Sequence, residues 1–101
     1  MSEEAHIRFR ADSLDVLPDD LGLIPTGDPG EYFMGKGTDR PAILEFYPER
    51  GGYWTATVFA ARDAVSRAVA VDLAARLTSR GLPTVAFLQD PGQPLTAAAV
   101  A

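Results

Sequence analysis

The sequence predicts an α+β fold with a mostly antiparallel sheet and one long helix packed on one face of that sheet. Two apolar segments on either side of a glycine-containing turn predict a β-hairpin, the Ala- and Val-rich segment after them predicts a helix, and a short apolar segment after the helix predicts a returning strand. A right-handed crossover through that helix would leave the last strand parallel to the strand before the helix, with room for one strand between them. A ferredoxin-like or split-βαβ sandwich is therefore the predicted architecture.

The first predicted strand covers residues 5–10, where apolar and polar side chains alternate. This period of two predicts a half-buried strand with Ile7 and Phe9 pointing inward. His6, the only histidine, lies on the outward side with Arg8 and Arg10, and we expect it to be a solvated side chain rather than a general base.

Residues 11–40 form an acidic and less regular part of the domain. Pro18 limits any helix here to a short turn, and the turn signal at 27–30 precedes a short predicted strand at 31–34. Residues 1–40 contain nine acids and four bases, a net charge of −5, whereas residues 41–101 contain five of each. The candidate acidic patch consists of Asp12, Asp15, Asp19, Asp20, Asp28 and Glu31.

The core unit covers residues 41–89 and starts with the hairpin, whose strands at 42–47 and 53–59 are rich in β-branched and aromatic residues. The paired glycines before the second strand supply the positive φ that a tight turn needs. Alternation directs Leu44, Phe46, Trp54, Ala56 and Val58 to the core. The opposite side chains are too aromatic for an ordinary solvated face, and they form the candidate interface or ligand face: Ile43, Glu45, Tyr47, Tyr53, Thr55, Thr57 and Phe59.

The helix is predicted to start at Asp63 as its N-cap and to stop at Arg80, because Gly81 suits a left-handed C′ position and Pro83 cannot continue a helix. At 100° per residue its larger side chains form one ridge that should cover the sheet: Val65, Val69, Leu73 and Leu77. A second stripe of mainly small residues is the candidate helix interface: Ala64, Ala68, Val71 and Ala75. Residues 83–89 then return as an apolar strand, which we expect to be an inner strand or covered on both faces.

Length and composition predict a single α+β domain over residues 1–95, followed by a frayed, small-residue tail at 96–101. The chain has 101 residues, of which 47% are hydrophobic and 23% charged, enough for one modest core. No apolar run is long enough to span a membrane and no signal-peptide pattern is present, so we expect a cytoplasmic protein without a membrane partner. The absence of cysteine excludes disulfides, thiolate catalysis and Cys-based metal sites.

No motif in the chain predicts an enzyme, a metal site or a cofactor. The spacing of Gly30, Gly35 and Lys36 imitates a phosphate-binding loop, but the intervening residues are bulky and strand-like, and no helix follows. The aspartates lack the spacing of a calcium loop. The acidic net charge opposes binding to nucleic-acid phosphates, and the aromatic face lacks the interleaved bases of RNA-binding sheets.

Two classes of function remain. The first is a non-enzymatic interaction or regulatory module, homodimeric through the open sheet face or the small-residue stripe of the helix. An acidic inhibitor or immunity-type protein that binds a basic partner would be a special case of it, although acids on solvated loops also serve solubility alone. The second is a small-molecule site in which Tyr47, Tyr53 and Glu45 line a pocket on the sheet.

Overall fold

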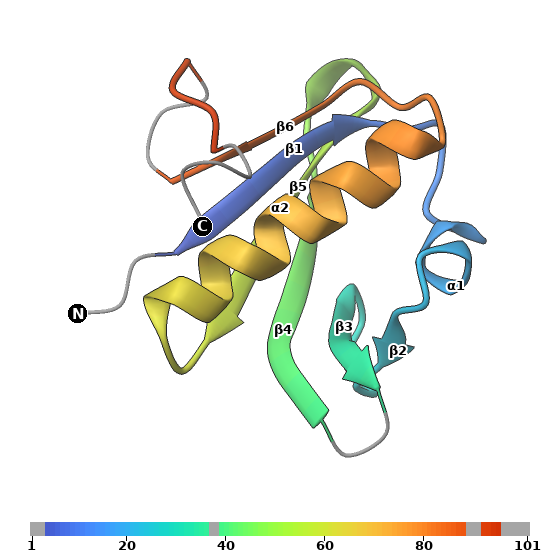
Figure 1. Ribbon diagram of the computed structural model, residues 1–101. Helices are drawn as coiled ribbons and strands as arrows, with labels where there is room; N and C mark the ends of the chain where they lie inside the picture. Colours follow the sequence, from blue (N-terminus) through green and yellow to red (C-terminus); the bar gives the residue numbers. More distant parts are fainter. Residues whose placement is uncertain (1–3, 37–38, 89–91, 96–101) are drawn as a thin grey trace.

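The computed structural model describes residues 4–36, 39–88 and 92–95. Over these residues the chain forms a six-stranded antiparallel sheet with one long helix on one face, which confirms the α+β prediction (Figure 1). The elements in chain order are β1 (Ala5–Arg10), α1 (Leu17–Asp20), β2 (Ile24–Pro25), β3 (Glu31–Lys36), β4 (Asp39–Pro48), the 3-10 turn η1 (Arg50–Gly52), β5 (Tyr53–Ala60), α2 (Asp63–Ser79) and β6 (Thr84–Phe87).

The strand order is β2-β3-β4-β5-β1-β6, so the first strand of the chain lies between β5 and β6. Because β1 is antiparallel to both neighbours, β5 and β6 are parallel to each other, with α2 as the crossover between them. This is the parallel return, with one strand inserted, that the sequence predicts. The order β4-β5-β1-β6 is compatible with a ferredoxin-like arrangement. In this chain the first crossover, from β1 to β4, contains α1, β2 and β3 instead of a long helix.

The predicted hairpin forms from β4 and β5, with Leu44 opposite Val58 and Phe46 opposite Ala56. Gly51 and Gly52 close it with φ angles of 72° and 79°, a region that favours glycine. The inward side chains of the hairpin are buried as predicted, except that Trp54 is half-buried. Its indole N–H donates a hydrogen bond to the carbonyl of Ala11 at 3.2 Å, because an aromatic N–H beside a core needs a partner.

Helix α2 packs on the sheet through the predicted ridge, in which Val69, Leu73 and Leu77 are buried and Val65 packs against the core from a partly buried position. They pack over a sheet face where Ile7, Phe9 and Leu44 are fully buried. Burial of each large side chain contributes about 1.5–3 kcal/mol, so the ridge and the sheet stabilise each other.

The ends of α2 differ in how well the sequence predicts them. Asp63 is the first helical residue and not the N-cap, which is Arg62 in an extended conformation. The prediction therefore assigned the cap one residue too late. The Asp63 carboxylate lies in the first turn, where its negative charge interacts favourably with the helix dipole. At the other end Gly81 has a φ of 77°, and the N–H groups of Gly81 and Leu82 reach the carbonyls of Thr78 and Leu77, as a Schellman motif requires.

The last strand, β6, lies at the edge of the sheet, so the alternative of an inner strand was wrong. Cover on both faces is found at its end, where the neighbouring residues Ala86 and Phe87 are both buried. The inner position is taken by β1, whose place in the sheet no local pattern indicates. Part of the outer edge of β6 is paired by the segment that follows it. Phe87 forms a bridge with Pro94, and the N–H of Leu95 donates to the carbonyl of Ala86 at 2.6 Å.

Residues 11–36 contain the short helix and the short strand that the sequence predicts, together with the two-residue strand β2, which it does not. Leu17, Leu21 and Leu23 are buried against the core, and α1 ends after one turn. Arg76 of α2 donates to the carbonyl of Leu21 at 2.8 Å, which ties this segment to the long helix. The predicted frayed tail at 96–101 lies outside the described residues.

Replacement of Leu73 by alanine is expected to destabilise the fold by about 2–5 kcal/mol, the usual cost of truncating a fully buried leucine. The free energy of unfolding from urea titration measures it. Val16→Ala is the matched control, because its side chain is 68% exposed and its truncation should change stability by less than about 0.5 kcal/mol. Equal effects of the two variants would contradict the packing of α2 on the sheet.

Candidate functional site

The candidate site is the sheet face opposite α2, called the open face from here on. All seven residues of the predicted interface or ligand face lie on it, because they alternate with the buried side chains of β4 and β5. The strand register adds side chains from the other four strands. The open face therefore consists of Ile24, Glu31, Phe33, Ile43, Glu45, Tyr47, Tyr53, Thr55, Thr57, Phe59, His6, Arg8, Arg10, Val85 and Phe87.

Large hydrophobic side chains on the open face remain in contact with solvent. Tyr47 is 46% exposed, Phe59 38% and Ile24 37%. Ile24, Phe33, Ile43 and Phe59 are successive cross-strand partners, so they form an apolar row across β2, β3, β4 and β5. Exposed apolar side chains that are contiguous in this way mark interaction surfaces more often than isolated ones do.

The centre of the open face is less exposed than the sequence predicts. Thr57 is only 6% exposed, and its hydroxyl lies 3.1 Å from Nδ1 of His6 on the neighbouring strand. His6 is half-buried between Thr57 and the ring of Phe87, whose centroid is 5.4 Å away. The expectation of a solvated His6 was therefore wrong, because β1 is an inner strand and its outward side chains have neighbours on both sides.

Acidic side chains occupy the β3–β4 half of the open face. Glu45 lies directly opposite Glu31, an arrangement of like charges that destabilises a pair of strands. The hydroxyl of Tyr47 donates a hydrogen bond to the carboxylate of Glu45. This hydrogen bond raises the pKa of the Tyr47 phenol, and the negative charges of Glu45, Glu4 and Glu31 raise it further.

Basic side chains occupy the β1 half of the open face. The guanidinium of Arg8 lies 4.8 Å from the ring centroid of Tyr53, and that of Arg10 lies 6.0 Å from the same ring. Arg8 Nε is also 3.3 Å from Oε2 of Glu49, although this buried nitrogen makes no aligned hydrogen bond. The sequence predicts that both arginines point outward. It does not predict that they lie beside Tyr53 on the open face, because the pairing of β1 with β5 was not predictable from spacing.

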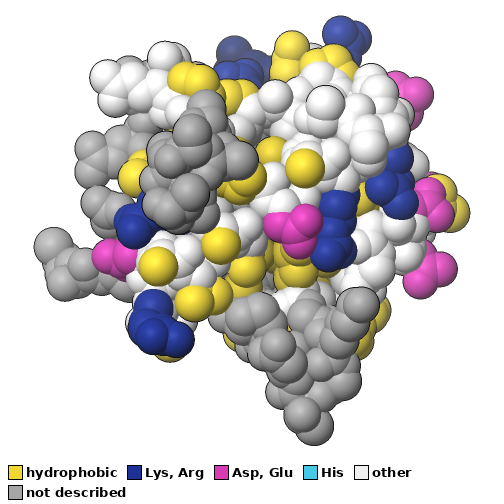
Figure 2. Space-filling view, viewed as in Figure 1, with side chains coloured by type: hydrophobic (Ala, Val, Ile, Leu, Met, Phe, Trp, Pro, Cys, Tyr) yellow, Lys and Arg dark blue, Asp and Glu magenta, His cyan; other side chains and the backbone are white. Residues whose placement is uncertain are grey.

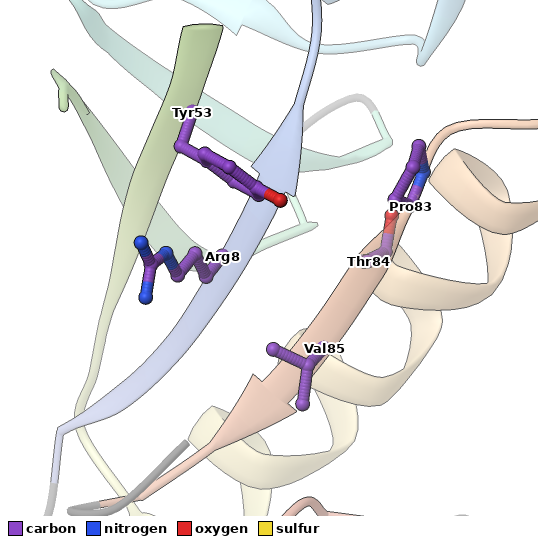
Figure 3. A pocket seen from close by; sticks show the side chains of 5 residues that line it. All are labelled: Arg8, Tyr53, Pro83, Thr84 and Val85. Carbon is purple, nitrogen blue, oxygen red and sulfur yellow. The ribbon is translucent and has the colours of Figure 1, made fainter. Parts of the chain in front are cut away.

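A hollow of about 340 Å³ lies beside Arg8 on the β1–β6 half of the open face. Tyr53 extends from β5 over β1, and its hydroxyl points toward β6, while Pro83 and Val85 form the opposite wall (Figure 3). The lining residues are Arg8, Tyr53, Pro83, Thr84 and Val85. The sequence predicts a small-molecule pocket lined by Tyr47, Tyr53 and Glu45. Of these three, Tyr53 lines the hollow, and Tyr47 and Glu45 do not.

The second predicted surface, the small-residue stripe of α2, lies on the solvent side of the helix. Ala64, Ala68 and Ala75 are exposed and Val71 is half-buried. Figure 2 shows that hydrophobic side chains on this side of the molecule are scattered among charged and other polar groups. The stripe is therefore accessible, but it presents little apolar surface.

The predicted acidic patch is divided between two places. Asp12, Asp15, Asp19, Asp20 and Asp28 are exposed, whereas Glu31 is half-buried on the open face. Two bases from the C-terminal end of α2 lie beside the part around α1: Arg80 donates to the backbone carbonyl of Asp20 and Arg76 to that of Leu21. The ion pair of Arg76, at 3.0 Å, is with Asp72 of the same helix. Figure 2 shows acidic and basic side chains side by side in this region, so the patch is not uniformly acidic.

Two kinds of site were looked for in the described part of the chain: a cluster of metal ligands and a phosphate loop. Within residues 4–36, 39–88 and 92–95 no three His, Asp or Glu side chains gather in a way that could hold a metal ion. The segment that imitates a phosphate loop is strand β3 over Glu31–Lys36, hydrogen-bonded to β4, and it is extended where such a loop must curl. No helix among these residues is long and apolar enough to cross a membrane.

The chain was compared with protein-family models, curated proteins and solved structures, and none of the three comparisons gives a match. Function is therefore inferred from the open face itself.

Removal of the negative charge in Glu45→Gln should lower the pKa of Tyr47 toward its usual value of 10.0, because the amide oxygen is a weaker hydrogen-bond acceptor than the carboxylate and the nearby charge is lost. A raised pKa in the folded state means that the contribution of this group to stability is present below pH 10.0 and is lost as the pH rises through the folded pKa. Tyrosinate absorbance during an alkaline titration measures the shift.

Tyr47→Phe is the control for that titration, because it should remove the late-titrating component from the three tyrosines of the chain. An unchanged titration curve in Glu45→Gln would contradict the hydrogen bond between the two side chains.

Proposed function

We propose that the protein is a non-enzymatic interaction module that forms a homodimer through the open face of its sheet. The observation that carries the proposal is the location of the exposed large hydrophobic side chains. Of the four that the described residues contain, three lie on the open face, namely Ile24, Tyr47 and Phe59, and the fourth is Val16 near α1.

The open face has a projected area of roughly 480 Å², which is smaller than the area of about 800 Å² that each partner buries in a standard interface. Six strands about 4.8 Å apart and about six residues long at about 3.3 Å per residue cover roughly 24 by 20 Å. The accessible area of such a face exceeds its projected area because side chains protrude, and a standard interface buries about 800 Å² per partner. A second copy is the partner that explains the apolar row and the aromatic side chains without a further component.

The helix stripe supports the alternative dimer less well. Ala64, Ala68 and Ala75 have small side chains, and the ion pair of Asp72 with Arg76 lies on the same helix at its exposed flank. Since the hydrophobic contribution follows the apolar area removed from water, at about 25 cal/mol per Å², an alanine stripe contributes less than a row of phenylalanine and isoleucine.

A basic partner at the acidic N-terminal region also receives less support. Arg76 and Arg80 interleave with the acids around α1, which reduces the negative potential that would attract a basic surface. We therefore favour self-association over the inhibitor-type alternative.

The test compares two single arginine substitutions on the two candidate surfaces. Phe59→Arg places a charge in the apolar row of the open face and should shift the protein from dimer to monomer in sedimentation velocity at micromolar concentration. Ala68→Arg places the same charge on the exposed stripe of α2, and that variant should remain dimeric. Circular dichroism should show both variants to be folded, since both positions are exposed.

A wild-type protein that stays monomeric throughout the concentration range would refute the proposal. A dimer that is lost in Ala68→Arg and retained in Phe59→Arg would transfer the interface to the helix.

A further inference from the structure

The charges of the open face are arranged in halves on either side of β5. Strand β3 contributes Glu31 and strand β4 contributes Glu45, while β1 contributes His6, Arg8 and Arg10. The residues of β5 between the two halves are uncharged: Tyr53, Thr55, Thr57 and Phe59.

The strand register places these residues in rows that cross the sheet. One row runs from Glu45 on β4 through Thr57 on β5 to His6 on β1. The next row runs from Tyr47 through Thr55 to Arg8. In each row the member on β4 and the member on β1 are one strand away from β5, on opposite sides of it.

We propose that two copies pack with their open faces together around a two-fold axis that runs close to β5, so that the acidic half of each copy covers the basic half of the other. This inference rests on the proposed function and adds to it the register, which is the orientation in which the second copy packs on the first. A half-turn about that axis places β1 of the second copy over β4 of the first. Each row of one copy then lies over the same row of the other copy. Glu45 then faces His6 of the second copy and lies within side-chain reach of its Arg8, and Tyr47 faces Arg8 of the second copy.

Electrostatics selects this axis over the other symmetric arrangement of two stacked sheets. An axis across the strands would place β4 over β4 and β1 over β1, so that the acidic half of one copy covers the acidic half of the other and the basic half covers the basic half. Like charges held together in an interface strongly oppose association. The axis along β5 avoids both repulsions, and it brings His6 of the second copy over Glu45, whose carboxylate repels that of Glu31 within one copy.

The shapes of the two halves agree with the same register. Among the large apolar and aromatic side chains of this face, Tyr47 is the most exposed, at 46%. Rotation about β5 brings it over Arg8, which lines the hollow together with Tyr53, Pro83, Thr84 and Val85 (Figure 3). An aromatic ring above a guanidinium and beside aliphatic walls is a favourable contact, because the cation attracts the ring face and the walls exclude water.

Charge reversal at Arg8 and Glu45, which the register brings within side-chain reach of each other across the interface, tests the proposal. Arg8→Glu alone would bring two carboxylates together at each of the two equivalent contacts of its homodimer, and Glu45→Arg alone would bring two guanidinium groups together there. The dissociation constant of each variant should therefore be roughly tenfold higher than that of the wild type, which corresponds to about 1.4 kcal/mol. An equimolar mixture of the two variants should dimerise like the wild type, since one contact of the mixed dimer is then native and the other has its two charges exchanged.

A second measurement does not depend on the stability of the charge variants. The chain has no cysteine, so Thr55→Cys introduces a single thiol on β5, beside the axis, where it meets its own copy. A short bismaleimide should crosslink it into a covalent dimer in high yield. Ala75→Cys is the control, because this exposed position on α2 is remote from the proposed interface and should stay uncrosslinked.

The outcomes separate the two proposals. A monomeric wild type overturns the proposed function and this inference together. A dimeric wild type whose charge variants do not rescue each other, or whose Thr55→Cys form does not crosslink, overturns the register. The comparison of Phe59→Arg with Ala68→Arg then decides separately whether the open face is the interface.

Discussion

The pairing of β1 with both β5 and β6 is the interaction on which the rest of the structure depends. The crossover from β5 through α2 to β6 leaves a gap one strand wide, and β1 closes it with hydrogen bonds on both edges. Ala5, Ile7 and Phe9 are fully buried beneath the helix as a result. Without β1, the last strand would have no neighbour in the sheet and α2 would lose the centre of the surface that it covers.

The same strand determines the chemistry of the opposite face. Because side chains alternate, every buried residue of β1 is followed by one on the open face, and these are His6, Arg8 and Arg10. They lie one strand away from β5, which separates them from the acids of β3 and β4. The division of the open face into an acidic and a basic half is therefore a consequence of strand order. Neither half is evident in the net charge of the chain, which is −5.

The parts of the fold that local pattern determines are those that the sequence predicts well. The hairpin glycines, the Schellman end of α2 at Gly81 and the ridge through Leu73 and Leu77 all follow from spacing and backbone preference. The seven residues of β4 and β5 on the open face follow from alternation alone. What could not be predicted is long-range: β1 is the strand between β5 and β6, β6 lies at the edge, and Arg76 reaches the backbone of Leu21 across 55 positions. These contacts depend on which strands pair, and sequence periodicity contains no information about pairing.

The most direct test of a self-complementary open face is a dilution series followed by backbone amide chemical shifts. Dissociation should move the resonances of β1, β4 and β5, above all around Thr55, Tyr47 and Arg8, with their shifts following one dissociation constant. The exposed stripe of α2, including Ala68, should not change. Shifts confined to α2, or spectra that are the same at every concentration, would contradict the account.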